Sequence, residues 1–180
     1  TFTISSDGSS IVEVDTLEHD IVHGQYNSLV QVDSDTYALA YAGTNDDGFI
    51  STFTIDSEGV ITPIQIQNHA AFASASENLE HDIVHGQYNS LVQVNSNTIA
   101  LAYAGAGDNG FISTFTIDSE GVITPIQIQN HASAYEEDDV ANLEHDRHRG
   151  MHNSLVQVNS DTYALAYEGL DRDGFISTFT

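Results

Sequence analysis

Bulky and small hydrophobic positions alternate over short stretches of this chain. The clearest stretch alternates large side chains with alanine, as Tyr37, Leu39 and Tyr41 against Ala38, Ala40 and Ala42. Short alternating runs bounded by Asp, Asn, Ser and Gly are typical of β-strands joined by tight turns. The pattern predicts four strands, at residues 28–32, 37–43, 48–55 and 60–67. Because neither face of 37–43 carries a charge, we expect both faces to be covered, the bulky face of one sheet packing on the small-residue face of the next.

This four-stranded pattern occurs three times. The segment Leu-Glu-His-Asp begins at Leu17, Leu79 and Leu143, and each copy is followed by Asn-Ser-Leu-Val-Gln-Val and then by Gly-Phe-Ile-Ser-Thr-Phe-Thr. Internal repetition at this period indicates a repeat architecture. We therefore expect residues 1–180 to form a single repeat domain, with units of approximately 1–51, 52–113 and 114–180, and insertions at 67–78 and 129–142 in the later units.

Repeated four-stranded units that are covered on both faces are typical of β-propeller blades. Pro63 and Pro125 predict that the fourth strand is an outer edge, because proline cannot donate to a ladder. The predicted fold class is thus all-β, with three propeller-type blades. Closed propellers have about four to eight blades. The chain is therefore part of a larger propeller, half of a six-bladed ring made by two chains, or a β-trefoil, in which three four-stranded units close.

The stretch YNSLVQVDSDTYALAYAGTNDDGFISTFTIDSEG, residues 26–59, also resembles tandem propeller-like repeats in large secreted or surface proteins of environmental, especially marine, microbes. The resemblance extends over nearly the whole chain. It implies an extracellular or cell-surface location and a binding or structural role, and it supplies no catalytic residues.

The charge balance excludes some partners. The chain has 27 acidic residues and three arginines, for a formal net charge of -24. Nucleic acids and anionic membranes need clustered basic side chains, so neither is an expected partner. The chain lacks cysteine, which excludes thiolate metal sites and cysteine nucleophiles. No apolar run approaches the roughly 20 residues of a membrane helix, so membrane insertion is not expected.

The histidines gather in one part of each unit. All nine fall in or beside the connections that precede residues 28–32 and their counterparts. Successive antiparallel strands return the chain to alternate ends. These connections and the acidic loops after the second strand should therefore share one face. That face is the predicted ligand-binding site, formed by His19, Asp20, His23, Tyr26, Asn27, His81, Asp82, His85, Tyr88, Asn89, His145, Asp146, His152 and Asn153.

Several chemistries suit these residues. Tyr26, Tyr88 or His152 would stack on a glycan while Asn and Asp side chains bond its hydroxyls. Imidazole and carboxylate groups that lie close together also suit Zn²⁺, although Arg149 replaces the histidine of the third unit. Alternatively, the histidines are structural and the aspartates cap turns. Ca²⁺ is the cation preferred over zinc, at the acidic loops containing Asp46, Asp47, Asp108, Asp171 and Asp173, where simple turn formation is the alternative.

An enzyme is not expected. Near-identical repeats offer no single asymmetric set of catalytic groups, and the serines near His and Asp begin core strands. The third unit alone carries a basic patch, formed by Arg147, His148, Arg149 and His152, which suits docking on an acidic loop of another copy. The sequence favours a non-enzymatic structural or adhesive module that associates with itself as a homo-oligomer or polymer. The alternative is a lectin or a metal-dependent adhesin.

Overall fold

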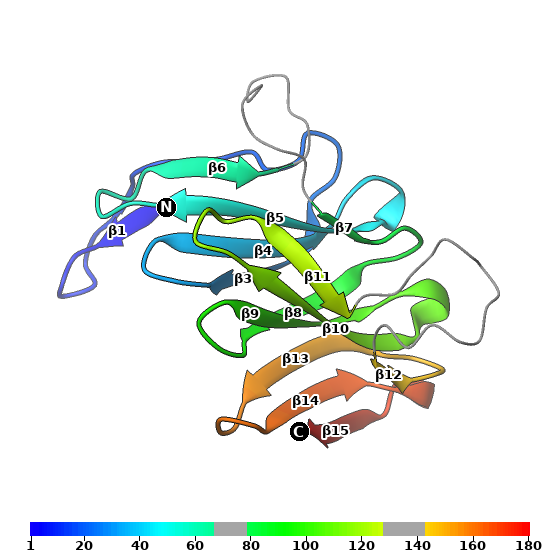
Figure 1. The fold of residues 1–180 in the computed structure, drawn as a ribbon. Coiled ribbons are helices and arrows are strands. Elements are labelled where there is room, and N and C mark those ends of the chain that lie inside the picture. The colour runs from blue at the N-terminus through cyan, green and yellow to red at the C-terminus, as the bar shows by residue number, and fades with distance from the viewer. Residues whose placement is uncertain (67–78, 128–142) are drawn as a thin grey trace.

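The protein is all-β in the computed structural model, which describes residues 1–66, 79–127 and 143–180 (Figure 1). The two insertions expected at 67–78 and 129–142, with His69 and His131, lie outside the described residues. In the described part of the chain, no helix has the length and apolar character needed to cross a membrane.

Three antiparallel sheets succeed one another along the chain (Figure 1). The first sheet has the order β3 (Gln25–Gln31), β4 (Thr36–Ala42), β5 (Gly48–Ile55), β6 (Ile61–Gln65), and β7 (Leu79–Asp82) also pairs with β5. The second repeats this order with β8 (Gln87–Gln93), β9 (Thr98–Ala104), β10 (Gly110–Ile117), β11 (Ile123–Gln127) and β12 (Leu143–Asp146). The third contains β13 (Met151–Gln157), β14 (Tyr163–Glu168) and β15 (Gly174–Phe179). The first two sheets therefore draw their strands from two adjacent repeat units, whereas all three strands of the third sheet come from the third unit.

The four predicted strands are present in the first two sheets and the first three of them in the third sheet, with small changes of boundary. The first begins three residues earlier than predicted, at Gln25. The predictions for the edge strands are confirmed, because β6 and β11, which contain Pro63 and Pro125, end the strand order of their sheets. A short 3-10 turn follows the second strand of each sheet, as η1 (Thr44–Asp46), η2 (Ala106–Asp108) and η3 (Leu170–Arg172).

The Leu-Glu-His-Asp segments differ from the sequence interpretation, which placed them in connections. Leu79–Asp82 and Leu143–Asp146 are strands β7 and β12. The reason lies in the register of the neighbouring strand. β6 pairs only with the second half of β5, from Thr52 to Ile55. The backbone groups of the first half, Gly48 to Ile50, are not paired with β6, and β7 pairs with them instead.

The predicted packing of bulky faces on alanine faces is confirmed. In the first junction, Ala38, Ala40 and Ile50 of the first sheet share a buried cluster with Leu101, Tyr103, Phe111 and Phe115 of the second. In the second junction, Ala100 and Ala102 pack with Leu155, Leu165 and Tyr167 of the third sheet. Alanine faces let the neighbouring backbone approach closely enough for aromatic rings to fill the space. Among the described residues, the three sheets do not close into a barrel or ring.

A hairpin of β1 (Phe2–Ile4) and β2 (Ile11–Glu13) lies against the turn between β5 and β6 of the first sheet. Its contact repeats a contact made elsewhere in the chain. The Thr1 hydroxyl donates to the Gly59 carbonyl at 2.5 Å, as the Thr52 hydroxyl donates to the Gly121 carbonyl at 2.6 Å. The hairpin thus occupies, against the first sheet, the position that β5 and β6 occupy against the second. Figure 1 places this hairpin at one end of the molecule and β15 at the other.

Candidate functional site

The connections before each first strand and the acidic loops share one face, as predicted. The amide of Gly86 donates to the carbonyl of Asp46 at 2.8 Å. The amide of Gly150 donates to the carbonyl of Asp108 at 2.7 Å. Each bond joins a connection to the acidic loop of the preceding sheet, so this loop face is continuous across both junctions.

The histidine of each Leu-Glu-His-Asp segment packs edge-on against a core tyrosine. His19 lies 4.5 Å from Tyr41 between ring centroids, and His81 and His145 each lie 4.7 Å from their tyrosines, Tyr103 and Tyr167. Burial lowers the pKa of His19, and it lowers the pKa of His145 to about 4. Desolvation disfavours the imidazolium, so these two rings are neutral near pH 7 and contribute packing area.

The aspartate after each of these histidines closes a turn. Asp82 Oδ1 accepts from the amides of Val84 at 2.8 Å and His85 at 2.9 Å. Asp20 and Asp146 accept from the corresponding amides at 2.8 to 3.0 Å. This Asx geometry fixes the path from the histidine to the next inner strand.

The acidic loops each hold their aspartates in a strained turn. Positive φ values occur in these loops at Asn45 (63°), Asp46 (67°), Asp108 (62°), Asp171 (59°) and Arg172 (67°). Asp47 and Asp173 instead cap the turns, and their carbonyls accept from Gly43 and Gly169 at 2.9 Å. The pKa of Asp47 is raised by burial and then by the charge of Asp82. Within the described ranges, no group of three or more His, Asp or Glu side chains is arranged to hold a metal ion.

An aromatic row follows the inner strands β3, β8 and β13. Tyr26 and Tyr88 lie 4.5 Å apart between ring centroids, and Tyr88 and His152 lie 4.3 Å apart. All three residues have φ of 52° or 53°, which is unusual for bulky side chains. Each sits where the register of its strand shifts, so a β-bulge turns the ring toward its neighbour. Burial and a hydrogen bond with Tyr26 raise the pKa of Tyr88 to about 12.

The residues after this row join adjacent inner strands. Asn89 Nδ2 donates to the carbonyls of Gly86 at 2.7 Å and Tyr26 at 3.3 Å. Asn153 makes the same bonds to Gly150 and Tyr88, at 2.8 and 3.2 Å. The structure thus gives Asn89 and Asn153 a role in packing. Asn27 donates to Gly24 in the same way, at 2.9 Å, but it has no preceding inner strand beside it in the described chain.

A serine adds a second bond at each junction. The amide of Leu91 donates to Ser28 Oγ, and the amide of Leu155 donates to Ser90 Oγ, both at 2.9 Å. The asparagine and serine bonds recur at both junctions and fix the register between neighbouring inner strands.

The third unit carries a charged pair that the other two lack. Arg149 Nε lies 2.9 Å from Glu168 Oε1, and His152 Nε2 lies 3.8 Å from Glu168 Oε2. The counterparts of Glu168 are Ala42 and Ala104. Sequence reasoning identified the basic side chains but missed Glu168, although its departure from alanine was a visible signal. Arg149 is thus engaged within its own sheet, and Arg147 pairs with Glu144 at 3.3 Å.

The two outermost sheet faces are exposed where their internal counterparts are buried. The head face is the inner part of the bulky side of the first sheet, with Asn27 and Leu29. Leu29 is 56% exposed, whereas its counterparts Leu91 and Leu155 are 8% and 6% exposed. The tail face is the small-residue side of the third sheet, formed by Val156, Val158, Ala164, Ala166, Gly174 and Ile176. Ile176 is 79% exposed, whereas its counterpart Ile50 is fully buried.

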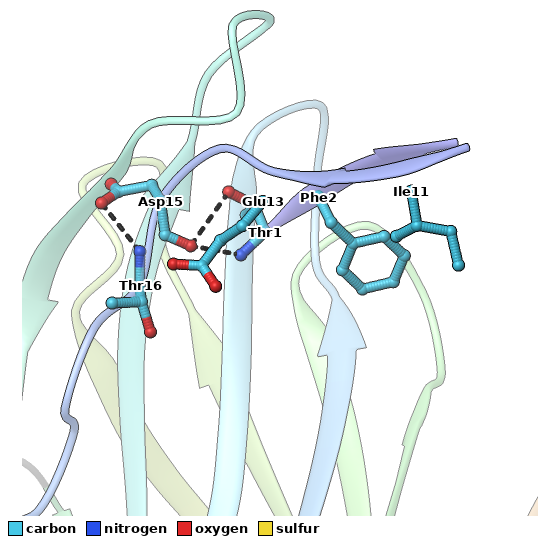
Figure 2. Close-up of a pocket in the computed structure, with 6 residues that line it drawn as sticks. All are labelled: Thr1, Phe2, Ile11, Glu13, Asp15 and Thr16. Carbon is cyan, nitrogen blue, oxygen red and sulfur yellow. Dashed lines mark hydrogen bonds between the residues drawn. The ribbon is translucent and has the colours of Figure 1, made fainter. Parts of the chain in front are cut away.

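A shallow pocket of about 300 Å³ lies on the N-terminal hairpin (Figure 2). Figure 2 shows Phe2 and Ile11 side by side on one wall, and Glu13 and Asp15 nearer the other end. The Thr1 ammonium donates to the Asp15 carbonyl at 2.6 Å, so the polar end is internally bonded. Phe2 and Ile11 are 63% and 69% exposed.

Comparison with protein-family models gives no match to this chain, and neither does comparison with curated proteins.

Proposed function

We propose that this chain is a non-enzymatic structural module of the extracellular space or cell surface, built from propeller-type blades, which assembles with further copies of itself head to tail. The observation that carries the proposal is the match between two exposed faces. The tail face presents the side chains that the first two sheets wholly or partly bury in their junctions, and the head face presents a leucine that the other sheets bury.

The internal junctions support this choice of partner. Ile50 and Val32 are 0% and 3% exposed in the first sheet, whereas Ile176 and Val158, at the same positions in the third, are 79% and 59% exposed. Exposed apolar side chains that gather on one face are typical of an interaction surface. The head face of a second copy is a bulky face of the kind that packs on such a surface in both internal junctions. A second copy is therefore the partner that the structure itself indicates.

The net charge of -24 opposes this association, because like charges repel across the new contact. Salt screens such repulsion over about 10 Å at 0.1 M. The proposal therefore predicts tighter association as ionic strength rises, in keeping with a saline extracellular medium.

Sedimentation velocity over a range of concentrations tests the proposal. Wild-type protein should exceed the 19.5 kDa of one chain as concentration rises, more so in 0.5 M than in 0.05 M NaCl. Ile176→Asp should weaken this association. The matched variant Ile83→Asp, at a 50% exposed residue of the turn between β7 and β8, should not. A compact species of 19.5 kDa at all concentrations would contradict the proposal.

The second candidate is glycan binding, which the aromatic row favours. Three rings held by strained backbone lie along one edge of the inner strands. Such strain is commonly found at ligand sites. A glycan array, with Tyr26→Ala as the control, and calorimetry with Ca²⁺ and Zn²⁺ test this candidate. Blank results in both would remove it, along with its metal-dependent form.

A further inference from the structure

We infer that residues 17–24 of a second copy add a strand to the third sheet by pairing with Gly174–Ile176, so that two copies close a ring of six sheets. This inference rests on the proposed self-association and adds the segment, the register and the number of copies.

The first two sheets show the pairing that the third lacks. β7 pairs with β5 so that Leu79 faces Ile50 and Asp82 faces Gly48. β12 pairs with β10 in the same register, with Leu143 facing Ile112. In the described chain, β15 pairs only with β14. Residues 17–20 have the sequence of β7 and β12, and they do not form a strand.

Gly174 provides independent evidence for this partner. A Cβ added at Gly48 would overlap the imidazole of His81 and approach Gly86. A Cβ added at Gly110 would meet His145 and Gly150 in the same way. At Gly174, no heavy atom lies within 4 Å of such a Cβ. The third sheet therefore has the same glycine, but the imidazole and the glycine backbone that pack on it elsewhere are missing.

Residues 19–24 already present the matching group. The His19 imidazole packs beside Gly24, where an added Cβ would lie 2.8 Å from its Cε1 atom. His19 is also seated against Tyr41, as His81 is seated against Tyr103. The His–Gly pair is therefore preassembled on one copy and matches the open surface at Gly174 of another.

Three further hydrogen bonds would join the two faces, with the donor on the head face of one copy and the acceptor on the tail face of the other. By analogy with the two internal junctions, the amide of Gly24 would donate to the Arg172 carbonyl, Asn27 Nδ2 to the His152 carbonyl, and the amide of Leu29 to Ser154 Oγ. Each of these bonds occurs twice within the chain, at 2.7 to 3.3 Å. The three donors are spaced along residues 24–29 as their counterparts are spaced in the two internal junctions.

Two copies then extend one another's third sheets. Each contributes two five-stranded sheets and a three-stranded third sheet that gains residues 17–24 of its partner as a fourth strand. The head-to-tail contact is heterologous, and such contacts give a closed ring when the rotation returns to the starting copy. Six sheets fall within the roughly four to eight blades of closed propellers.

Disulfide trapping tests the register, because the native chain has no cysteine. Directly opposed residues of antiparallel strands have Cα atoms about 4.5 to 5.5 Å apart, within the range that a disulfide spans. The double variant Leu17→Cys with Ile176→Cys should therefore oxidise to a covalent species of two chains. The matched control, Leu17→Cys with Ile83→Cys, should stay uncrosslinked.

The outcomes separate this inference from the proposed function. Self-association without the Leu17–Ile176 crosslink would overturn the register, and a ladder of larger covalent species would overturn the closed ring. Both results leave self-association standing, whereas a monomeric wild type overturns both proposals. As a second arm, Gly174→Val should weaken association at least tenfold with an unchanged circular dichroism spectrum. Unchanged association of this variant would also overturn the inference.

Discussion

Leu29 allows the head face to be tested against two internal controls. The same leucine occurs at three equivalent positions, and it is 56% exposed at Leu29 but 8% and 6% exposed at Leu91 and Leu155. Leu91→Ala and Leu155→Ala should each destabilise the folded chain by about 3 kcal/mol, because they leave cavities in existing junctions. Leu29→Ala should cost the isolated chain well under about 1 kcal/mol, since surface substitutions have small effects.

The effect of Leu29→Ala should instead appear in association. Docking of a second copy would bury about half of the leucine side chain, if Leu29 becomes as buried as Leu91. Full burial of such a side chain is worth about 1.5 to 3 kcal/mol. The lost contact, with the small cavity it leaves, is then worth about 1.5 kcal/mol per junction, or roughly a tenfold rise in Kd.

Two measurements check this prediction. Urea unfolding at a concentration where the chain is monomeric should rank the three variants by stability, with Leu29→Ala close to wild type. Sedimentation equilibrium at higher concentration should then show the tenfold rise in Kd for Leu29→Ala. An unchanged Kd would refute the assignment of Leu29 to an interface, and a stability loss as large as that of Leu91→Ala would show that Leu29 is already buried.

The remaining predictions concern packing and charge. Gly48→Ala should destabilise the fold by about 2 kcal/mol or more, because its Cβ overlaps a buried imidazole, while Gly174→Ala should leave urea unfolding of the monomer unchanged. Because the pKa of His145 is lowered, the unfolded chain takes up the proton first as pH falls, and the free energy of unfolding decreases between about pH 6.5 and about pH 4. Urea titrations at pH 7.5 and pH 5 measure this decrease, and His145→Gln should make it smaller by about 1 to 2 kcal/mol. Glu168→Ala alone should destabilise the fold more than the double variant Glu168→Ala with Arg149→His, because the single variant leaves Arg149 without its partner. A double-mutant cycle should give a coupling free energy of about 1 kcal/mol between the two residues, and a coupling of zero would show that the pair contributes nothing to stability.

Much of the fold was predictable because its signals are local. Alternation over Tyr37–Ala42 gives both the strand and its two faces, and Pro63 marks an edge whatever the surroundings. The packing of alanine on aromatic faces also followed from the residues, because a face of small side chains accepts only a bulky neighbour at close range.

The Leu-Glu-His-Asp strands were not predictable from their own residues. β7 has four residues, and its pairing depends on β6 leaving half of β5 unpaired. The first half of β5 is not paired with β6 because of the register between β5 and β6, and the residues of a single segment do not determine that register. The bulges at Tyr26 and Tyr88 escaped prediction for a similar reason, because left-handed backbone at a tyrosine has no propensity signal and is imposed by packing. The role of Asn89 as a link between inner strands likewise depends on which strand lies opposite it.

The two unlike faces of each sheet bear on how such a protein grows. The alanine face of the first sheet, with Ala38 and Ala40, packs on the bulky face of the second, with Leu101 and Tyr103. Because every unit has one face of each kind, the alanine face of one unit fits the bulky face of another copy, and two like faces do not fit each other. A gene duplication in register therefore adds a unit that fits at once, without new compensating substitutions. Selection is then strict on the buried faces and loose on the rims, where Arg149 and Glu168 have diverged as a pair. The number of units would be limited only by the angle between neighbouring sheets.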